Sequence, residues 1–435
     1  MRLLPCFVAF GMLAACNSGS GPAAEAGDEG TQGGSTNTAS SGAPTAETGS
    51  PGEFVGLSFE TLEAEGDWGM ITDARFIPGT DELFVLEKSG RVGHLRLEGD
   101  RFVLLGSFVL DGAYSVLDCG LISLALDPDF ATNGFLYVGM CVSEQQSEIR
   151  RYTLEAGDYA SAPATEALIL AVGDPAAPKP WHNVGSIGFE PDGTMWALFG
   201  DKKVAANGQD ATNPLSALVR LIPNREPGGE GYTVPQGNAF ASEEDGHPLV
   251  YATGLRSPWK GIRDTAGRFW FGDVGSNTME EVNVVTEVGQ NFGWSAAEGR
   301  CALGCSELTD PVLQWSHTGV SDYAAEDPDV VPTNARVAYV ALEVEPHASD
   351  PYAGALDGHV LFGDYCQGWV RGAQLDPAGT VTADTHLGHL FVPSAWVRAR
   401  DGYIYAMTFG KCETPSIDEN DPPMSTFVRA VPVFE

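Results

Sequence analysis

The stretch HNVGSIGFEPDGTMWALFGD, from His182 to Asp201, decides the fold of this chain. It reads as one apolar strand, a Pro-Asp-Gly turn and a second apolar strand that ends in Gly-Asp, which is typical of a β-hairpin. Looser copies begin at Ala74, Leu121, Gly261, Gly354 and Trp396. About six repeated hairpins predict an all-β chain whose sheets stack radially into a propeller.

The two ends of the repeated region also have the composition of strands. Residues 54–62 and 426–434 are rich in apolar and β-branched side chains. We expect the first of these strands to complete the last blade. The longest insertions separate Asp201 from Arg256 and Trp294 from Gly358. Loops of that length in a compact domain usually carry function.

The first residues, MRLLPCFVAFGMLAAC, have the pattern of an export signal, with a basic residue, a short apolar run and small residues before a cysteine. LAAC resembles a bacterial lipobox, so residues 1–16 are predicted to be a lipoprotein signal and Cys16 to carry the lipid. An ordinary secretory signal cleaved nearby is the alternative. The apolar run is too short to span a bilayer, so the lipid would be the anchor.

Residue 17 is not Asp, which by resemblance to Gram-negative sorting patterns suggests an outer-membrane lipoprotein that faces the periplasm or the cell surface. Residues 17–53 are mostly small and polar, which predicts a disordered tether. Residues 54–435 would then form the propeller.

The charge balance limits the ligands. The chain has 24 Lys and Arg against 59 Asp and Glu, a formal charge of -35. Nucleic-acid binding requires a basic surface and is excluded. Neutral sugars or glycans, alcohols and cations remain acceptable partners.

Six cysteines remain once the leader and its lipidated cysteine are set aside, an even number that suits an oxidising compartment. Cys119 and Cys141 flank one hairpin, where antiparallel pairing would set them side by side. Six cysteines allow fifteen pairings, so the connectivity stays open. The other candidate pairs are Cys301 with Cys305, which would close a small loop, and Cys366 with Cys412, which would join the last two blades.

The opening stretch resembles the HxGGxLxFxPDGxLYVxxGD signature of the glucose/sorbosone dehydrogenase family. The segments YATGLRSPWKG, FWFGDVGSNTMEEVNVV, GQNFGWSAAEG, GLISLALDPDFATNGFLYV and VLFGDYCQGWV agree with it. The resemblance implies a six-bladed β-propeller of four-stranded antiparallel blades. It also implies sugar oxidation by pyrroloquinoline quinone (PQQ), held with Ca²⁺ at the top of the central channel. The cysteine-bearing GDYC segment is similar to the branch that contains the hedgehog-interacting protein propeller.

The resemblance assigns roles to individual residues. His182 matches the general base, Asp201 the carboxylate that orients it, and Arg256 a cation beside the quinone oxygens; imidazole suits the base because its pKa lies near neutral pH. Ser257 replaces the usual Asn of the cofactor site. Gly275 and Ser276 match the backbone carbonyls that hold Ca²⁺.

Trp181 and Trp259 flank this site and are the predicted sugar contacts. The other tryptophans, Trp294 among them, are expected to pack between blades. The other histidines show no ligand spacing and are expected to be structural or exposed, namely His94, His247, His317, His347, His359, His386 and His389.

The chain departs from the family where quinone-binding members carry arginines, since residues 391–394 hold no cation. Each charge-assisted bond to a PQQ carboxylate is worth about 1.5–3 kcal/mol, so losing two or three costs roughly 3–9 kcal/mol. The candidate substitutes are Lys202, Lys203, Lys260 and Lys411.

Two functions therefore remain. One is a lipid-anchored, PQQ-dependent aldose dehydrogenase that passes electrons to an acceptor in the cell envelope. The other is a non-catalytic propeller that binds a carbohydrate or a protein partner. A Ca²⁺-dependent lactonase is a weaker third option, because the motif detail argues against it.

Overall fold

The computed structural model describes residues 52–301, 305–318, 322–331, 333, 335–409, 412 and 425–435. The predicted leader with Cys16, all but the last two residues of the predicted tether, and Lys411 lie outside these residues. Among the described residues no helix has the length and apolar character to cross a membrane. The description below concerns the unit Pro51–Glu435.

Nearly every element of this unit is a strand, and all the strand pairs that the structure describes are antiparallel except a short parallel contact between residues 63–64 and 101–102. That contact joins the first and last of six successive blades into one eight-stranded sheet. Short α- and 3₁₀-helices lie in the connections, at Phe130–Asn133 (α1), Ala162–Thr165, Ala205–Gln209 and Asp322–Ala325. Blade 1 consists of β2 (Ile71–Phe76), β3 (Glu82–Glu87), β4 (Arg91–Glu98) and β5 (Arg101–Val109). Blade 2 consists of β6 (Leu121–Leu126), β7 (Phe135–Cys141), β8 (Gln146–Thr153) and β9 (Ala167–Gly173). Blade 3 consists of β10 (Val184–Phe189), β11 (Met195–Phe199), β12 (Ala217–Pro223) and β13 (Tyr232–Thr233).

Blade 4 consists of β15 (Pro258–Arg263), β16 (Phe269–Asp273), β17 (Met279–Val285) and β18 (Leu313–Ser316). Blade 5 consists of β19 (Ala338–Glu343), β20 (Val360–Asp364), β21 (Trp369–Leu375) and β22 (Val381–His389). Blade 6 consists of β23 (Pro393–Arg398), β24 (Ile404–Thr408), β25 (Thr426–Phe434) and β1 (Phe54–Ala64). Blade 3 departs from the four-strand pattern, because β14 (Val250–Thr253) also pairs with β12. The outer edge of β12 is thus shared between β13 and β14.

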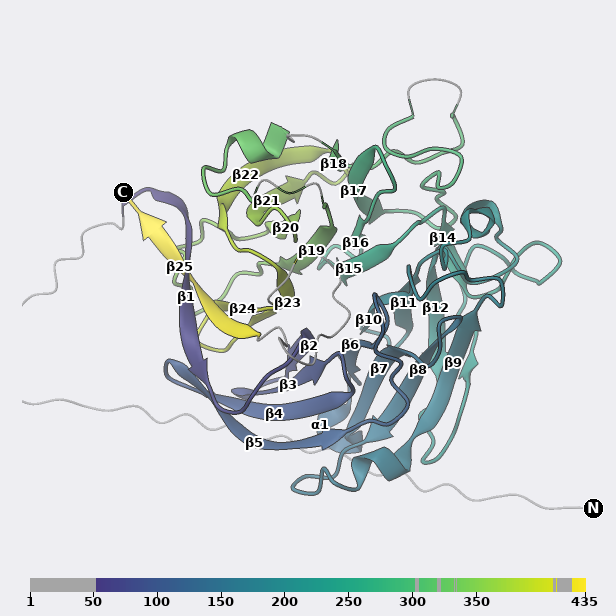
Figure 1. Cartoon of the computed structure of the whole chain (residues 1–435), viewed down its shortest axis with the longest axis horizontal. Coiled ribbons are helices and arrows are strands. Elements are labelled where there is room, and N and C mark those ends of the chain that lie inside the picture. Colours follow the sequence, from purple (N-terminus) through teal and green to yellow (C-terminus); the bar gives the residue numbers. More distant parts are fainter. Residues whose placement is uncertain are drawn as a thin grey trace, which may run out of the picture. The chain divides into compact units, whose positions relative to one another are not determined.

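The innermost strands of the six blades contact one another in a closed cycle, from β2 through β6, β10, β15, β19 and β23 and back to β2. They surround the centre of the ring in Figure 1. Apolar clusters fill the spaces between neighbouring blades. One of them combines Tyr137 and Ile149 of blade 2 with Phe199 and Val219 of blade 3. The six-bladed all-β prediction is confirmed.

The ring closes through its first strand, as predicted. β1 runs antiparallel to β25, in a register that extends from Phe54↔Phe434 to Leu62↔Phe427. The purple and yellow strands lie side by side in Figure 1. Both chain ends of the described unit are therefore held in one blade, which adds backbone hydrogen bonds between the first and last strands.

The three cysteine pairs that the sequence suggested are disulfides. Cys119 and Cys141 bridge the ends of one hairpin, with Cα atoms 5.4 Å apart. Cys301 and Cys305 close a short loop. Cys366 follows β20 and Cys412 follows β24, so their bond joins blades 5 and 6.

Candidate functional site

The hairpin that opens blade 3 brings His182 and Asp201 together. Val184 pairs with Phe199 in the antiparallel register, so the residue two positions before β10 faces the residue two positions after β11. The backbone of Gly200 passes close to His182, because a Cβ at Gly200 would lie 2.6 Å from the His182 carbonyl oxygen. The Gly-Asp ending of this hairpin thus has a structural reason: glycine permits the close approach and aspartate pairs with the histidine.

The His182 ring is held by one carboxylate oxygen. Its Nδ1 lies 2.5 Å from Asp201 Oδ1. Asp201 also accepts bonds from the Lys203 backbone N–H (2.7 Å) and from Trp294 Nε1 (2.8 Å). Because an ionised carboxylate only accepts, the shared proton belongs on Nδ1, and Nε2 is left as a lone-pair acceptor. Burial lowers the pKa of His182, whereas its hydrogen bond to Asp201 favours the charged ring; at neutral pH the imidazole is an unprotonated base.

The backbone around this pair is strained. His182, Lys202 and Lys203 adopt φ angles of 53°, 54° and 59°, in the left-handed region that side chains other than glycine rarely occupy. Each such residue costs of order 1–3 kcal/mol and persists where the surrounding structure imposes it. The strain lies at the same place as the candidate base.

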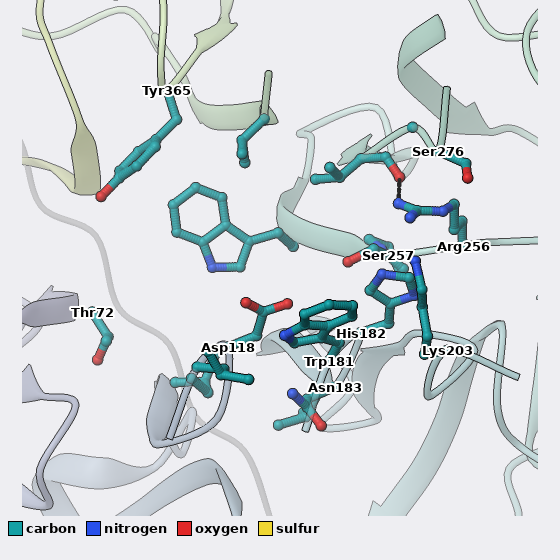
Figure 2. A pocket seen from close by; sticks show the side chains of 18 of the residues that line it. Thr72, Asp118, Trp181, His182, Asn183, Lys203, Arg256, Ser257, Ser276 and Tyr365 are labelled. Atoms are coloured by element: carbon teal, nitrogen blue, oxygen red, sulfur yellow. Dashed lines mark hydrogen bonds between the residues drawn. The ribbon is translucent and has the colours of Figure 1, made fainter. Parts of the chain in front are cut away.

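A cavity of about 360 Å³ opens beside this pair, a volume within the range of small-molecule sites. Figure 2 shows how His182, Trp181 and Asp118 lie across it from Tyr365. Seven of the predicted site residues line it: Trp181, His182, Arg256, Ser257, Trp259, Gly275 and Ser276. Hairpins and loops of different blades thus bring these residues together at one cavity.

Arg256 is positioned in a similar way, by an aspartate at the end of a strand of blade 4. Pro258 pairs with Asp273, which ends β16, and the Asp273 carboxylate accepts the backbone N–H groups of Arg256 (2.9 Å) and Ser257 (2.6 Å). The Arg256 guanidinium donates to the Val274 carbonyl at 2.6 Å, the bond drawn as a dashed line in Figure 2. Its position beside His182 disfavours a charged imidazole and keeps the base neutral.

The turn that would hold Ca²⁺ is fixed by two carboxylates, the buried Glu280 and the half-buried Glu298. Glu298 accepts the backbone N–H groups of residues 276–279, and Glu280 accepts that of Gly275 at 3.0 Å. These bonds use the N–H groups of the turn. Backbone carbonyls suit Ca²⁺. Among the described residues, no group of three or more His, Cys, Asp or Glu side chains is arranged to hold a metal ion.

Of the candidate lysines that the structure describes, Lys203 lines the cavity, whereas Lys202 and Lys260 do not. Lys202 is fully buried, and its Nζ donates to Ser147 Oγ and Asn183 Oδ1. Lys260 Nζ donates to the Thr72 carbonyl at 2.6 Å. Neither residue is brought to the cavity wall. Lys203 does line the cavity, with its Nζ 5.2 Å from the centre of the Trp181 ring.

Sequence reasoning missed several residues of the site. Lys88, Asp118, His317 and Tyr365 line the cavity, although the histidine was expected to be structural or exposed. Trp294, expected to pack between blades, donates to Asp201 instead. Burial raises the pKa of the Asp118 carboxyl and lowers that of Lys88 to about 8. The resemblance to the family marked the position of Asp118 only as a departure, where a glutamine-type residue is replaced, and gave it no role in the site.

Solved structures share the fold. The PQQ-bound aldose sugar dehydrogenase of Streptomyces coelicolor is 20% identical with a TM-score of 0.64, and the match covers 87% of this chain and 98% of that one. The soluble aldose sugar dehydrogenase of Escherichia coli in its apo-form is 16% identical with a TM-score of 0.64, over 87% and 100% of the two chains.

Among curated proteins, the HIPL1 protein of Arabidopsis thaliana is 31% identical over 133 residues, which are 27% of this chain and 19% of that protein. The Hedgehog-interacting protein of Mus musculus is 26% identical over 197 residues, or 41% and 28% of the two chains. The chain thus matches less than a third of the length of either relative.

The family model described as Glucose / Sorbosone dehydrogenase matches residues 65–319, more than half of the chain and the part that supplies most of the cavity wall. This chain therefore belongs to the glucose/sorbosone dehydrogenase family.

Proposed function

We propose that the protein oxidises an aldose or a related sugar, with His182 as the general base. The observation that carries the proposal is the His182–Asp201 pair at the wall of a ligand-sized cavity. Nδ1 is held by the carboxylate, so Nε2 is the nitrogen that would accept the proton of the sugar hydroxyl. Asp201 orients the ring and stabilises the imidazolium formed as the proton arrives.

The lining residues of the cavity support a cofactor of the PQQ type, which is anionic and aromatic. Lys88, Lys203 and Arg256 line it and would pair with carboxylates, which compensates for the arginines absent from residues 391–394. The rings of Trp181 and Trp259 offer flat apolar faces. PQQ, when bound, supplies a two-electron acceptor for the hydride of the sugar. Gly275 and Ser276 would contribute carbonyl oxygens to an accompanying Ca²⁺.

In this proposal the residues that line the cavity also exclude bulk water from the candidate base. His182 is 7% exposed and Arg256 8% exposed, and both line the cavity. A low-dielectric environment strengthens the interaction of a cation with developing negative charge. Arg256 is positioned to supply that interaction near His182.

A second candidate function is ligand binding without catalysis. The Hedgehog-interacting protein is named for a protein partner, and it matches 41% of this chain. In this reading the cavity would bind a carbohydrate or a segment of a partner protein, and the His182–Asp201 pair would only maintain its shape.

The proposed location is the outer membrane of a Gram-negative envelope, with the lipid on Cys16 as anchor. A Cys16→Ser variant expressed beside the wild type tests this. The wild type should incorporate labelled palmitate and fractionate with outer membranes. The variant should lose the label, whereas equal release of both proteins as soluble chains would contradict the anchor.

Titration of PQQ into the purified protein with Ca²⁺, followed by dye reduction with a panel of aldoses, separates the two functions. The dehydrogenase reading expects micromolar or tighter quinone binding and sugar-dependent turnover. Sugar binding without quinone binding would favour the non-catalytic propeller and reject the enzyme.

A further inference from the structure

A second histidine at the cavity wall is paired with a carboxylate behind it. His317 lines it, and its Nδ1 lies 2.5 Å from Glu280 Oε1. The histidine follows β18 and the glutamate lies in β17, so the pair belongs to blade 4, whereas His182 and Asp201 belong to blade 3. Two neighbouring blades each contribute one imidazole to one ligand-sized space.

The hydrogen bonds of Glu280 determine which nitrogen of His317 carries the proton. Glu280 is fully buried, and its two oxygens accept the backbone N–H groups of Gly275 (3.0 Å) and Ala338 (2.7 Å). Both oxygens therefore act as acceptors, and the shared proton with His317 lies on Nδ1. Nε2 of the neutral ring is then an acceptor, as it is in His182.

The ring is also fixed through its backbone. The His317 N–H donates to the Thr278 carbonyl at 2.8 Å, and Ser316 pairs with Met279 in the β17–β18 register. His317 is thus tied to the same turn that carries Gly275 and Ser276. A rigid acceptor of this kind recognises a hydroxyl at low entropic cost, because little freedom remains to be lost on binding.

We propose that His317 accepts a hydrogen bond from a second hydroxyl of the substrate, and so selects polyhydroxy substrates over simple alcohols. The inference rests on the proposed function, in which His182 takes the proton of the reacting hydroxyl. A sugar carries several hydroxyl donors, so one molecule can meet both acceptors. Glu280 is the positioning residue, since it holds the tautomer that makes Nε2 an acceptor.

The chain offers a matched control. His389 Nδ1 lies 2.8 Å from Asp327 Oδ2, and its side chain is 21% exposed against 20% for His317. His389 does not line the cavity. A substitution at His389 removes a similar histidine–carboxylate pair without touching the proposed binding wall.

The test combines His317→Ala and His389→Ala with an aldose and its series of monodeoxy analogues, in steady-state dye reduction with PQQ and Ca²⁺. In the wild type, one analogue should show a KM raised roughly tenfold, the effect of one lost hydrogen bond. His317→Ala should raise the KM for the parent aldose by the same factor, leave that analogue unaffected, and keep kcat within about threefold. His389→Ala should reproduce the wild type.

A second variant is needed in case the His317→Ala protein does not fold. His317→Gln keeps an amide donor for Glu280 and an oxygen acceptor, so its KM should lie between those of the wild type and His317→Ala. Calorimetric binding of the same sugars provides a readout independent of turnover. If the wild type oxidises sugars but His317→Ala and His317→Gln shift every analogue equally, or shift none, the inference is overturned and the dehydrogenase stands. If the wild type neither oxidises nor binds any sugar, the proposed function fails and this inference fails with it.

Discussion

The indole N–H of Trp294 donates to Asp201 Oδ2 at 2.8 Å, although 93 residues separate the two in the chain. The other oxygen of that carboxylate holds His182. The candidate base is therefore oriented by a chain of three side chains that begins in the GQNFGW segment and ends at the cavity. The Arg256 guanidinium lies 5.4 Å from the centre of the same indole ring, so Trp294 supports both of them.

Trp294→Phe should lower kcat roughly tenfold, because Asp201 loses one donor and holds the imidazole less rigidly, while the ring beneath Arg256 is retained. A hydrogen bond to a charged group contributes about 1.5–3 kcal/mol to stability. Trp270→Phe is the control, since Trp270 donates to buried Asp264 at 2.8 Å away from the cavity. It should cost similar stability in a denaturant titration and leave kcat unchanged; an equal loss of kcat in both variants would contradict the role of Trp294.

The pH dependence of kcat/KM should report His182. Burial lowers its pKa below the ordinary histidine value of 6.5, so activity should rise with pH through an apparent pKa below 6.5 and be level at neutral pH. Asp201→Asn removes the carboxylate that favours the protonated ring. The acidic limb of the kcat/KM profile should then move to still lower pH. The value of kcat should fall about 10²- to 10⁴-fold, because the tautomer of His182 is no longer fixed. A limb that moves to higher pH would contradict this assignment.

Asp118 places a carboxyl group in the cavity wall that Lys88 and Arg256 also line. Burial raises the pKa of its carboxyl, and His182, Lys88 and Arg256 partly offset that effect. Asp118→Asn removes a like charge and should strengthen PQQ binding about tenfold by calorimetry. Asp111→Asn makes the same change in net charge at an exposed position. Equal affinities of the two variants would show that Asp118 does not face the bound anion.

The Cys366–Cys412 bond should contribute more to stability than the Cys301–Cys305 bond. The first closes a separation of 46 residues and the second one of 4. In the chain-entropy estimate they are worth about 4 and about 2 kcal/mol. Paired Cys→Ser variants compared by thermal unfolding should therefore melt in that order. The reverse order would indicate that strain or residual structure outweighs loop closure.

The ring and one side of the site were predictable because both depend on local repetition. Each hairpin carries its own signal, and the Gly-Asp ending recurs after β11, at the end of β16 and at the end of β20. Antiparallel register then places His182 opposite Asp201 without any long-range information.

The remaining wall was not predictable, because it depends on loops without periodicity. His317 lies in the long insertion before β19, where no pattern distinguishes it from exposed histidines. Lys260 was misplaced because its Nζ is used by the Thr72 carbonyl, whereas its neighbour Trp259 lines the cavity; the β15 register is irregular between Pro258 and Gly261, so simple strand alternation does not give the outcome. Lys202 and Lys203 lie in a turn after β11 with left-handed backbone angles, which strand periodicity does not predict, and Lys203 lines the cavity.

The central claim is that His182 is the base of a sugar-oxidising site. The most direct test is kcat/KM for the preferred aldose in His182→Gln beside His389→Gln, both loaded with PQQ and Ca²⁺ and both checked for unchanged quinone affinity. The account predicts a loss of about 10²- to 10⁴-fold in the first variant and none in the second. Turnover of His182→Gln at the wild-type rate would contradict it.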